Sequence, residues 1–280
     1  MQTIILCADD FAMTPGISKG ICELLKKKRL SATSCMTISP LWSEYSTWLK
    51  PFKEHADIGL HLTLTDFPSL SNLSFTDSKG RLPPFKKLFK LAYGNRLNNK
   101  EITMEFQSQF EAFQKEFGSM PDFIDGHQHI HQLPVIRKSV IELFKNNFQK
   151  GDGYLRICWE NPLLVWKRNV NILRTLIIGF PGLKMRKLAR KEGIPFNDGF
   201  SGIYSLSLNK NISALFSCFL IGVREKSLII CHPGKIDFGS TPEINLTKTR
   251  EAEYRFLDSL AFQSILDQKQ MRLGRFKECK

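Results

Sequence analysis

The sequence of 280 residues lacks several features that identify membrane, secreted or repetitive proteins. It contains no run of about 18 apolar residues, which excludes a membrane-spanning helix, and it has no internal repeat. Its N-terminus has neither a basic segment nor a long apolar segment, so we expect no signal peptide. The seven cysteines include no C-x-x-C pair, and their odd number favours free thiols over a disulfide framework. These absences predict a cytoplasmic protein.

Acidic residues are the minority charge, with 27 Asp and Glu against 40 Lys and Arg. The excess is concentrated in residues 161–191, which hold eight Lys or Arg, no Asp or Glu, and many interleaved Leu, Ile, Val, Trp and Phe. This pattern predicts a basic amphipathic insertion, which either contacts an anionic membrane or packs as an ordinary helix with a solvated basic face. No nucleic-acid recognition motif accompanies it, so we do not expect a nucleic-acid partner.

Four short apolar runs each end in side chains that bind metals or transfer protons. They are IILCADD (4–10), DIGLHL (57–62), FIDGHQHIH (123–131) and LIICHPG (228–234). Such runs are typical of buried parallel strands, and the loops after parallel strands face a common pocket. Five of the six histidines therefore lie where an α/β enzyme builds its active site, whereas His55 precedes its strand and is expected at the surface. The distribution predicts a metal-dependent enzyme.

The rest of the chain alternates between strand-like and helix-like segments. Residues 65–84 form a long loop that is expected to serve as a lid or substrate wall. No interdomain linker interrupts the alternation, so the predicted fold class is α/β, a distorted (β/α) barrel in a single domain over residues 1–280. Further strands are predicted at 31–38, 154–157 and 203–206, and helices at 42–52, 100–117, 133–148 and 248–264.

The first two candidate ligand positions each have a structural alternative. Asp9 and Asp10 follow a strand, where they either cap the next helix or place one metal ligand and one base in the pocket. His61 lies within an apolar strand, where a histidine is either a ligand or a hydrogen-bonded core residue.

The histidine-rich segment is harder to explain as core, because burying three imidazoles without ligands would be costly. Asp125, His127, His129 and His131 occur at every second residue and would share one face if the strand continued. His232 is placed either as a catalytic group on the opposite wall or as a structural cap. Two imidazoles and one carboxylate suit Zn²⁺, Mn²⁺ or Mg²⁺ and leave positions open for water and substrate.

These segments resemble those of the YdjC-like family. ILCADDFAMTPGI, GLHLTL, FIDGHQHIHQLP, NDGFSG, IICHPG and REAEYRFL occur in that family's order and span essentially the whole chain. The family is similar to carbohydrate deacetylases on a distorted (β/α) barrel, related in chemistry to polysaccharide deacetylases. The resemblance implies one divalent metal ion, Mg²⁺ or Zn²⁺, with Asp10, His61 and His127 as ligands. It also implies Asp9 as the base and His232 as the acid.

Two positions depart from the family's pattern. Ala12 stands where Gly is usual, and Cys158 replaces the proline of R-x-P-x-E, an arginine motif that here begins at Arg156. We expect Arg156 to hold Asp9 or to bind sugar hydroxyls. The other residues expected to bind substrate or to orient a metal ligand are His129, His131 and Asp125.

Within the family, RLPPF (81–85), QFEAF (109–113) and the basic insertion resemble the hopanoid-biosynthesis-associated (HpnK-like) branch. That resemblance implies removal of an acetyl group from an N-acetylglucosaminyl lipid, a glycolipid met at the inner membrane surface. The family's other well-known branch acts on chitooligosaccharides or diacetylchitobiose. Alternatives from other classes are a metal-dependent phosphoester hydrolase, which the positive charge would suit, and a non-catalytic sugar- or lipid-binding protein. The sequence leaves the oligomeric state open, a homo-oligomer included.

Overall fold

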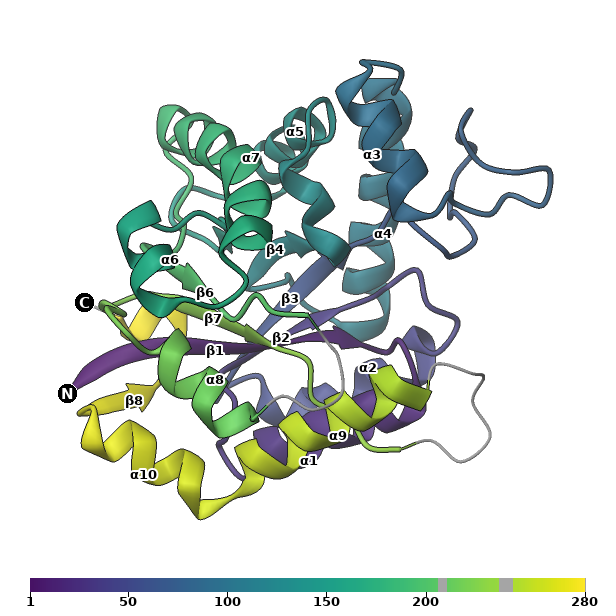
Figure 1. Ribbon diagram of the computed structural model, residues 1–280. Helices are drawn as coiled ribbons and strands as arrows, with labels where there is room; N and C mark the ends of the chain where they lie inside the picture. The colour runs from purple at the N-terminus through teal and green to yellow at the C-terminus, as the bar shows by residue number, and fades with distance from the viewer. Residues whose placement is uncertain (206–210, 237–243, 280) are drawn as a thin grey trace.

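The computed structural model describes the whole chain except residues 206–210, 237–243 and 280 and the side chains of 244–247 (Figure 1). Its centre is an eight-stranded sheet in which all strand pairings are parallel. Seven strands follow the order β5-β4-β3-β2-β1-β7-β6, and β8 pairs with β1. The strands are β1 (Gln2–Phe11), β2 (Ala32–Cys35), β3 (Asp57–Leu62), β4 (Phe123–Gly126), β5 (Tyr154–Leu155), β6 (Phe200–Ser201), β7 (Leu228–Cys231) and β8 (Met271–Leu273).

The sheet curls into a half-barrel. Within the described residues no strand pairing joins β5 to β6, so the curled sheet stays open, with helices around its outside (Figure 1). Strand β1 lies near the middle of this order and is buried along nearly its whole length. Its almost unbroken apolar run is what a parallel strand covered on both faces requires. The predicted fold class, α/β with a distorted (β/α) barrel, is confirmed.

Helices cover the outside of the curled sheet. Figure 1 shows α3, α4, α5 and α7 on one side of the molecule and α1, α9 and α10 on the opposite side. None of the helices in the described part of the chain is long and apolar enough to cross a membrane. The α-helices are α1 (Pro15–Lys26), α2 (Trp42–Leu49), α3 (Phe85–Tyr93), α4 (Asn99–Phe117), α5 (Ile136–Asn147), α6 (Pro162–Arg168), α7 (Ile172–Lys191), α8 (Ile212–Phe219), α9 (Ile244–Asp258) and α10 (Leu260–Gln268), and the 3-10 helices are η1 (Lys50–Phe52), η2 (His127–Gln132) and η3 (Phe276–Glu278).

Two predicted elements differ from the observed ones in more than their end residues. The strand expected at 203–206 lies earlier, at β6, because Gly202 (φ 101°) turns the chain closely over Ile230; residue 206 itself lies outside the described residues. The helix expected at 248–264 divides into α9 and α10 at Ser259, whose backbone is extended and whose hydroxyl accepts a hydrogen bond from the Phe262 N–H. Helix α3 lies in a stretch for which no element is predicted.

Candidate active site

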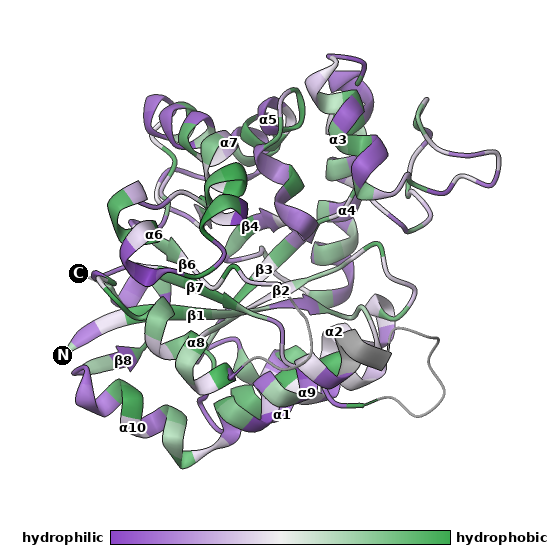
Figure 2. Cartoon of the chain, viewed as in Figure 1, coloured by the Kyte–Doolittle hydropathy of each residue, from purple (hydrophilic) through white to green (hydrophobic). Residues whose placement is uncertain are grey.

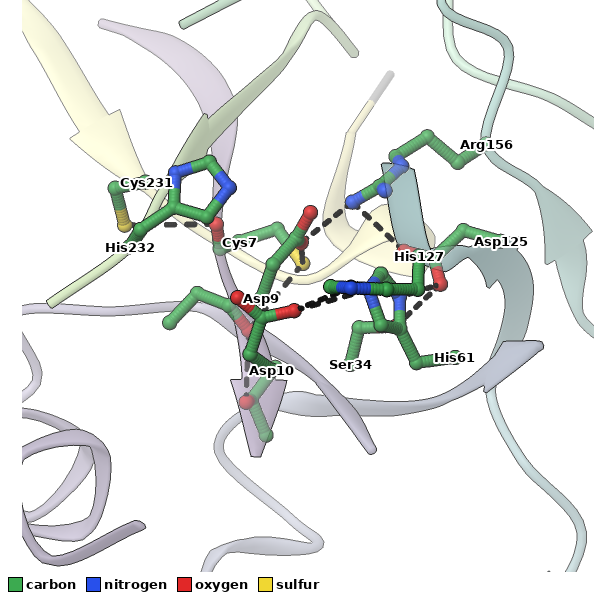
Figure 3. A network of polar contacts seen from close by, with 12 residues as sticks. Cys7, Asp9, Asp10, Ser34, His61, Asp125, His127, Arg156, Cys231 and His232 are labelled. Atoms are coloured by element: carbon green, nitrogen blue, oxygen red, sulfur yellow. Dashed lines mark hydrogen bonds and ion pairs between the residues drawn. The ribbon is translucent and has the colours of Figure 1, made fainter. Parts of the chain in front are cut away.

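A cavity of about 650 Å³ lies at the carboxyl ends of the strands. Its floor is formed by Asp9 and Asp10 from β1, His61 from β3 and His127 from η2 (Figure 3). His232, which follows β7, lines a wall. Parallel strands bring their carboxyl ends to one edge of a sheet, so residues far apart in the sequence meet there. The structure thus brings together all five residues that the family resemblance implies as ligands, base and acid.

Asp9 and Asp10 both line the cavity although they are neighbours near the end of a strand. Asp10 and Ala12 both have φ angles of 70°, in the left-handed region, and the register between β1 and β2 shifts at this point. These distortions turn the strand so that both carboxylates reach the same space. Neither acid caps the following helix, because Thr14 is the N-cap of α1 and accepts a hydrogen bond from the Ile17 N–H.

Asp10, His61 and His127 present a compact set of metal-binding atoms. Nδ1 of His127 lies 2.9 Å and Nε2 of His61 3.4 Å from Oδ1 of Asp10, and one donor atom from each residue lies within 4.8 Å of the others. Nε2 of His61 is buried without a hydrogen-bond partner among the described residues, which leaves it available to a cation. Burial alone would raise the pKa of Asp10, but Arg250 and His127 hold it well below its usual range. Two imidazoles and one ionised carboxylate fit a divalent ion.

The other ring nitrogen of His61 is held by a polar pair. Nδ1 lies 2.6 Å from Oδ1 of Asp125 and 2.8 Å from Oγ of Ser34, and Ser34 in turn donates to Asp125. Burial alone would lower the pKa of His61, but Asp125 and Asp10 raise it to about 10, so this position favours positive charge. An imidazole that binds metal through one nitrogen usually donates through the other, so Asp125 stands where a ligand-orienting residue belongs. Nothing in the sequence singles out Ser34.

Arg156 is fully buried behind the acids. Its Nη1 lies 2.5 Å from Oδ1 of Asp9 and 2.7 Å from Oδ2 of Asp125 (Figure 3). Burial alone would lower the pKa of Arg156, and these two carboxylates raise it well above its usual value. Of the two expected roles, holding Asp9 is the one this geometry supports.

The expectation that Asp125, His127, His129 and His131 share one strand face is wrong. Strand β4 ends at Gly126, and the chain continues as η2, in which Gln128 (φ 53°) and His129 (φ 60°) are left-handed. The turn sends the histidines in different directions, so only His127 meets Asp10.

The two remaining histidines have separate surroundings. His131 is buried, and its Nε2 lies 2.9 Å from the Arg156 carbonyl oxygen, so it donates there as a neutral ring. Burial, followed by the charge of Arg156, lowers the pKa of His131 to about 3. His129 lines the cavity, with Nδ1 3.4 Å from Sγ of Cys158. Neither ring reaches the acids of the floor through a hydrogen bond in the described residues.

Helix α9 holds the loop that carries His232. The His232 backbone N–H donates to Oε2 of Glu253 at 2.6 Å, and the Gly234 N–H donates to the Arg250 carbonyl oxygen at 3.1 Å. The hydroxyl of Tyr204, which lines the cavity, donates to the other oxygen of Glu253. Two hydrogen bonds donated by backbone N–H groups therefore fix the loop that carries His232, and within the described residues its side chain makes no capping hydrogen bond.

The same helix reaches the metal-binding atoms. Nη2 of Arg250 lies 2.5 Å from Oδ2 of Asp10. Burial raises the pKa of Glu253 to about 7 and lowers the pKa of His232 to about 4, so the His232 ring is neutral at pH 7. Arg250 and Glu253 carry no predicted role, although their spacing of three residues in REAEYRFL places them on one helix face.

The two departures from the family's pattern have visible consequences. Ala12 adopts a left-handed conformation that favours glycine, and its N–H donates to the Ser18 hydroxyl at 3.0 Å. The Cys158 N–H donates to Oε1 of Gln132 at 2.8 Å, a bond that a proline could not make. The cysteine thus ties this loop to η2.

The basic stretch 161–191 forms α6 and α7 and is divided in its environment. Arg168 is buried in an ion pair with Glu160, 2.9 Å away, so it is not part of a solvated basic face. Arg174 and Ile177 of α7 line the cavity. The loop 65–84 contributes Asp66 and Phe67 to the lining, as expected of a substrate wall.

Known proteins resemble this chain along almost its whole length. A family model described as YdjC-like protein matches residues 3–268. A chitooligosaccharide deacetylase of Yersinia pestis bv. Antiqua (strain Angola) is 28% identical over 279 residues, 99% of each chain, and one of Yersinia pseudotuberculosis serotype O:3 (strain YPIII) is equally similar. A solved structure of a candidate cellobiose-phosphate cleavage protein from Enterococcus faecalis V583 has a TM-score of 0.75 at 20% identity, covering 99% of this chain and 98% of that one. The last similarity concerns the fold alone.

Proposed function

Because the chain belongs to the YdjC-like protein family, we propose that it removes the acetyl group from an N-acetylated amino sugar by metal-dependent hydrolysis. The observation that carries this proposal is the meeting of Asp10, His61 and His127 around one point of the cavity, with Asp9 and His232 beside it. The names of the two Yersinia relatives, both chitooligosaccharide deacetylases, support it.

The metal would be held by a carboxylate oxygen of Asp10, Nε2 of His61 and a ring nitrogen of His127. Mg²⁺ and Zn²⁺ both fit this set of donors. A bound ion would polarise the acetyl carbonyl and lower the pKa of water at the site. Arg250, which touches the other oxygen of Asp10, and Asp125, which touches the other nitrogen of His61, would keep both ligands oriented.

The chain's own residues would move the protons. Asp9, oriented by Arg156, takes a proton as the water oxygen adds to the acetyl carbon. His232 gives a proton to the sugar nitrogen as the C–N bond breaks and acetate leaves. Because His232 is neutral in the resting protein, it must first receive a proton, and the one released to Asp9 is the nearest source. The two residues would thus act as a relay rather than as an independent acid and base.

For the substrate we propose a lipid-linked amino sugar, such as an N-acetylglucosaminyl polycyclic lipid of the hopanoid type. The support is the cavity lining, which includes Met13, Phe67, Phe85, Phe89, Leu133, Ile177 and Ile178. Apolar walls suit a lipid body better than a chain of sugars, which needs hydrogen-bonding groups along its length. Such a substrate would bring the protein to an anionic inner membrane surface. Chitooligosaccharides, named for the relatives, are the second candidate.

Measuring the free acetate released by the metal-loaded protein tests both the proposed reaction and the proposed substrate. We expect release from an N-acetylglucosaminyl lipid in mixed micelles, and slower release from diacetylchitobiose. Faster release from the soluble sugar would overturn the lipid assignment and leave deacetylation standing. Phosphate release from sugar phosphates without acetate from any N-acetyl substrate would overturn deacetylation itself.

A further inference from the structure

Two helices contribute to the rim of the cavity and project from the same side of the molecule (Figure 1). Helix α7 supplies Arg174 and Ile177 to the lining, and helix α3 supplies Phe85 and Phe89. Figure 2 shows hydrophobic and hydrophilic residues mixed along both helices. Helix α7 belongs to the basic stretch visible in the sequence, whereas α3 lies far from it in the chain. The fold therefore adds a second helix to the surface around the cavity.

The outward side of α7 carries a row of exposed apolar side chains. Leu173, Ile177 and Phe180 are 73%, 53% and 60% exposed, and their spacing of four and three residues places them on one helix face. Ile177 also lines the cavity, so the row reaches the rim. On α3, Tyr93 is 52% exposed and its ring centroid lies 4.4 Å from that of Phe89, which lines the cavity. Apolar residues gathered in this way indicate a surface that a partner covers.

Cations accompany the apolar residues on both helices. Neither the sequence of α3, FKKLFKLAY, nor that of α7, ILRTLIIGFPGLKMRKLARK, contains Asp or Glu. The cations exposed on these helices show no ion pair with any residue in the described ranges; they include Lys86, Lys87, Lys90, Lys184 and Lys187. Apolar and basic residues on one helix surface are typical of interfacial helices, and phospholipid headgroups offer a continuous negative surface.

We propose that α3 and α7 form a docking surface for an anionic lipid bilayer, with the cavity rim between them facing the lipid headgroups. Leu173, Phe180 and Tyr93 enter the headgroup region while the lysines lie against lipid phosphates. Helix α6, which packs against α7, adds the exposed residues Leu163 and Trp166. This inference goes beyond the proposed deacetylation and does not depend on it, because binding to a bilayer requires neither the metal nor a sugar.

Cosedimentation with vesicles tests the proposal on the full-length protein. We expect binding to vesicles of phosphatidylcholine with phosphatidylglycerol at low salt, weaker binding at high salt, and little binding to phosphatidylcholine alone. Each cation near an anionic leaflet changes affinity by about fivefold. The triple variant Lys86→Gln, Lys87→Gln, Lys90→Gln should therefore bind about a hundredfold more weakly when all three lysines lie at the leaflet.

A matched control removes the same charge elsewhere. Lys19 and Lys26 of α1 and Lys269 at the end of α10 are exposed, and Figure 1 places α1 and α10 on the opposite side of the molecule from α3. Changing these three lysines to Gln should leave vesicle affinity within about twofold. A second variant, Leu173→Gln with Phe180→Gln, should bind vesicles more weakly than the wild type at low salt and at high salt alike. It removes apolar contact rather than charge, so its loss of binding should not depend on salt.

Three results would overturn the docking surface. The first is a wild-type protein that ignores anionic vesicles at low salt. The second is equal binding by the α3 triple variant and its control. The third is a change of oligomeric state in the Leu173 and Phe180 variant without a change in vesicle binding, which would assign the surface to a second copy of the chain. Acetate release from a soluble N-acetyl sugar is measured on the same samples, so a failure of docking is distinguished from a failure of deacetylation.

Discussion

The floor and the rim of the cavity are made of opposite kinds of surface. The floor holds Asp9 and Asp10, and each of these buried acids is paired with a buried arginine, Asp9 with Arg156 and Asp10 with Arg250. The rim, on α3 and α7, holds exposed lysines and exposed apolar side chains. A buried charge is tolerated only when an opposite charge or hydrogen bonds neutralise it, so removing one partner of a buried ion pair leaves the other unpaired and destabilises the fold. Exposed residues of the rim do not need charge partners inside the protein, so their identity depends on what this surface contacts.

The comparison predicts its largest effect at the floor ligands. His61→Ala or His127→Ala removes a nitrogen donor from a set of three, so bound metal and acetate release on every substrate should both be lost. Metal content by elemental analysis and acetate release check this. Phe180→Gln on the rim is the control and should retain the metal. Full metal occupancy in both histidine variants would end the ligand assignment.

The proton-transferring residues should show a smaller loss. Asp9→Asn or His232→Ala should keep the metal and lower kcat by roughly 10²-fold, because a proton acceptor or donor is lost while the ligands remain. Turnover and metal content are measured on the same preparation. Near-normal kcat in either variant, on an unactivated amide, would remove that residue from the mechanism. The rim control should again resemble the wild type on a soluble sugar.

Much of the floor could be predicted from sequence because parallel strands fix where their ends lie. The apolar runs ending at Asp10, His61 and His232 indicated strands, and a parallel sheet brings such ends to one edge. The contribution of α9 could not be predicted, because Arg250 meets Asp10 only through packing of distant segments. Periodicity also failed at η2, since two left-handed residues cancel the alternation that a strand would keep.

The rim was only half visible in the sequence, for a related reason. A basic apolar stretch marked α7, but α3 is a short helix whose relation to it arises from the fold. Arg168, one of the eight basic residues of that stretch, is buried against Glu160. Charge patterns in a sequence do not distinguish a cation that faces solvent from one that an interior acid neutralises.

The third prediction concerns the hydrogen bond between the His232 backbone N–H and Glu253. Glu253→Ala removes the acceptor of the His232 N–H, so the ring should lose its fixed position and kcat should fall roughly tenfold with little change in KM. Glu253→Gln should recover most of the loss, since its amide oxygen can accept from His232 while its NH₂ donates to Tyr204. A merely structural role would lower stability in both variants and leave kcat of the folded fraction unchanged.

The last predicted effect is on stability rather than on catalysis, and it compares the buried His131, which contacts Arg156, with the rim. Burial, followed by the charge of Arg156, lowers the pKa of His131 to about 3, and Asp125 opposes this only in part. In the unfolded chain His131 binds a proton as the pH falls through about 6.5, whereas in the folded protein it stays neutral until a much lower pH. The contribution of His131 to stability is therefore complete above pH 6.5 and is lost as the pH falls below it. Between pH 7 and 5 the expected loss is about 2 kcal/mol. The free energy of unfolding is measured by denaturant titration at pH 7 and at pH 5. Its decrease between the two pH values should be about 2 kcal/mol smaller for His131→Gln than for the wild type, whereas Phe180→Gln should show the same decrease as the wild type. An equal decrease in the free energy of unfolding for all three proteins would contradict the lowered pKa of His131.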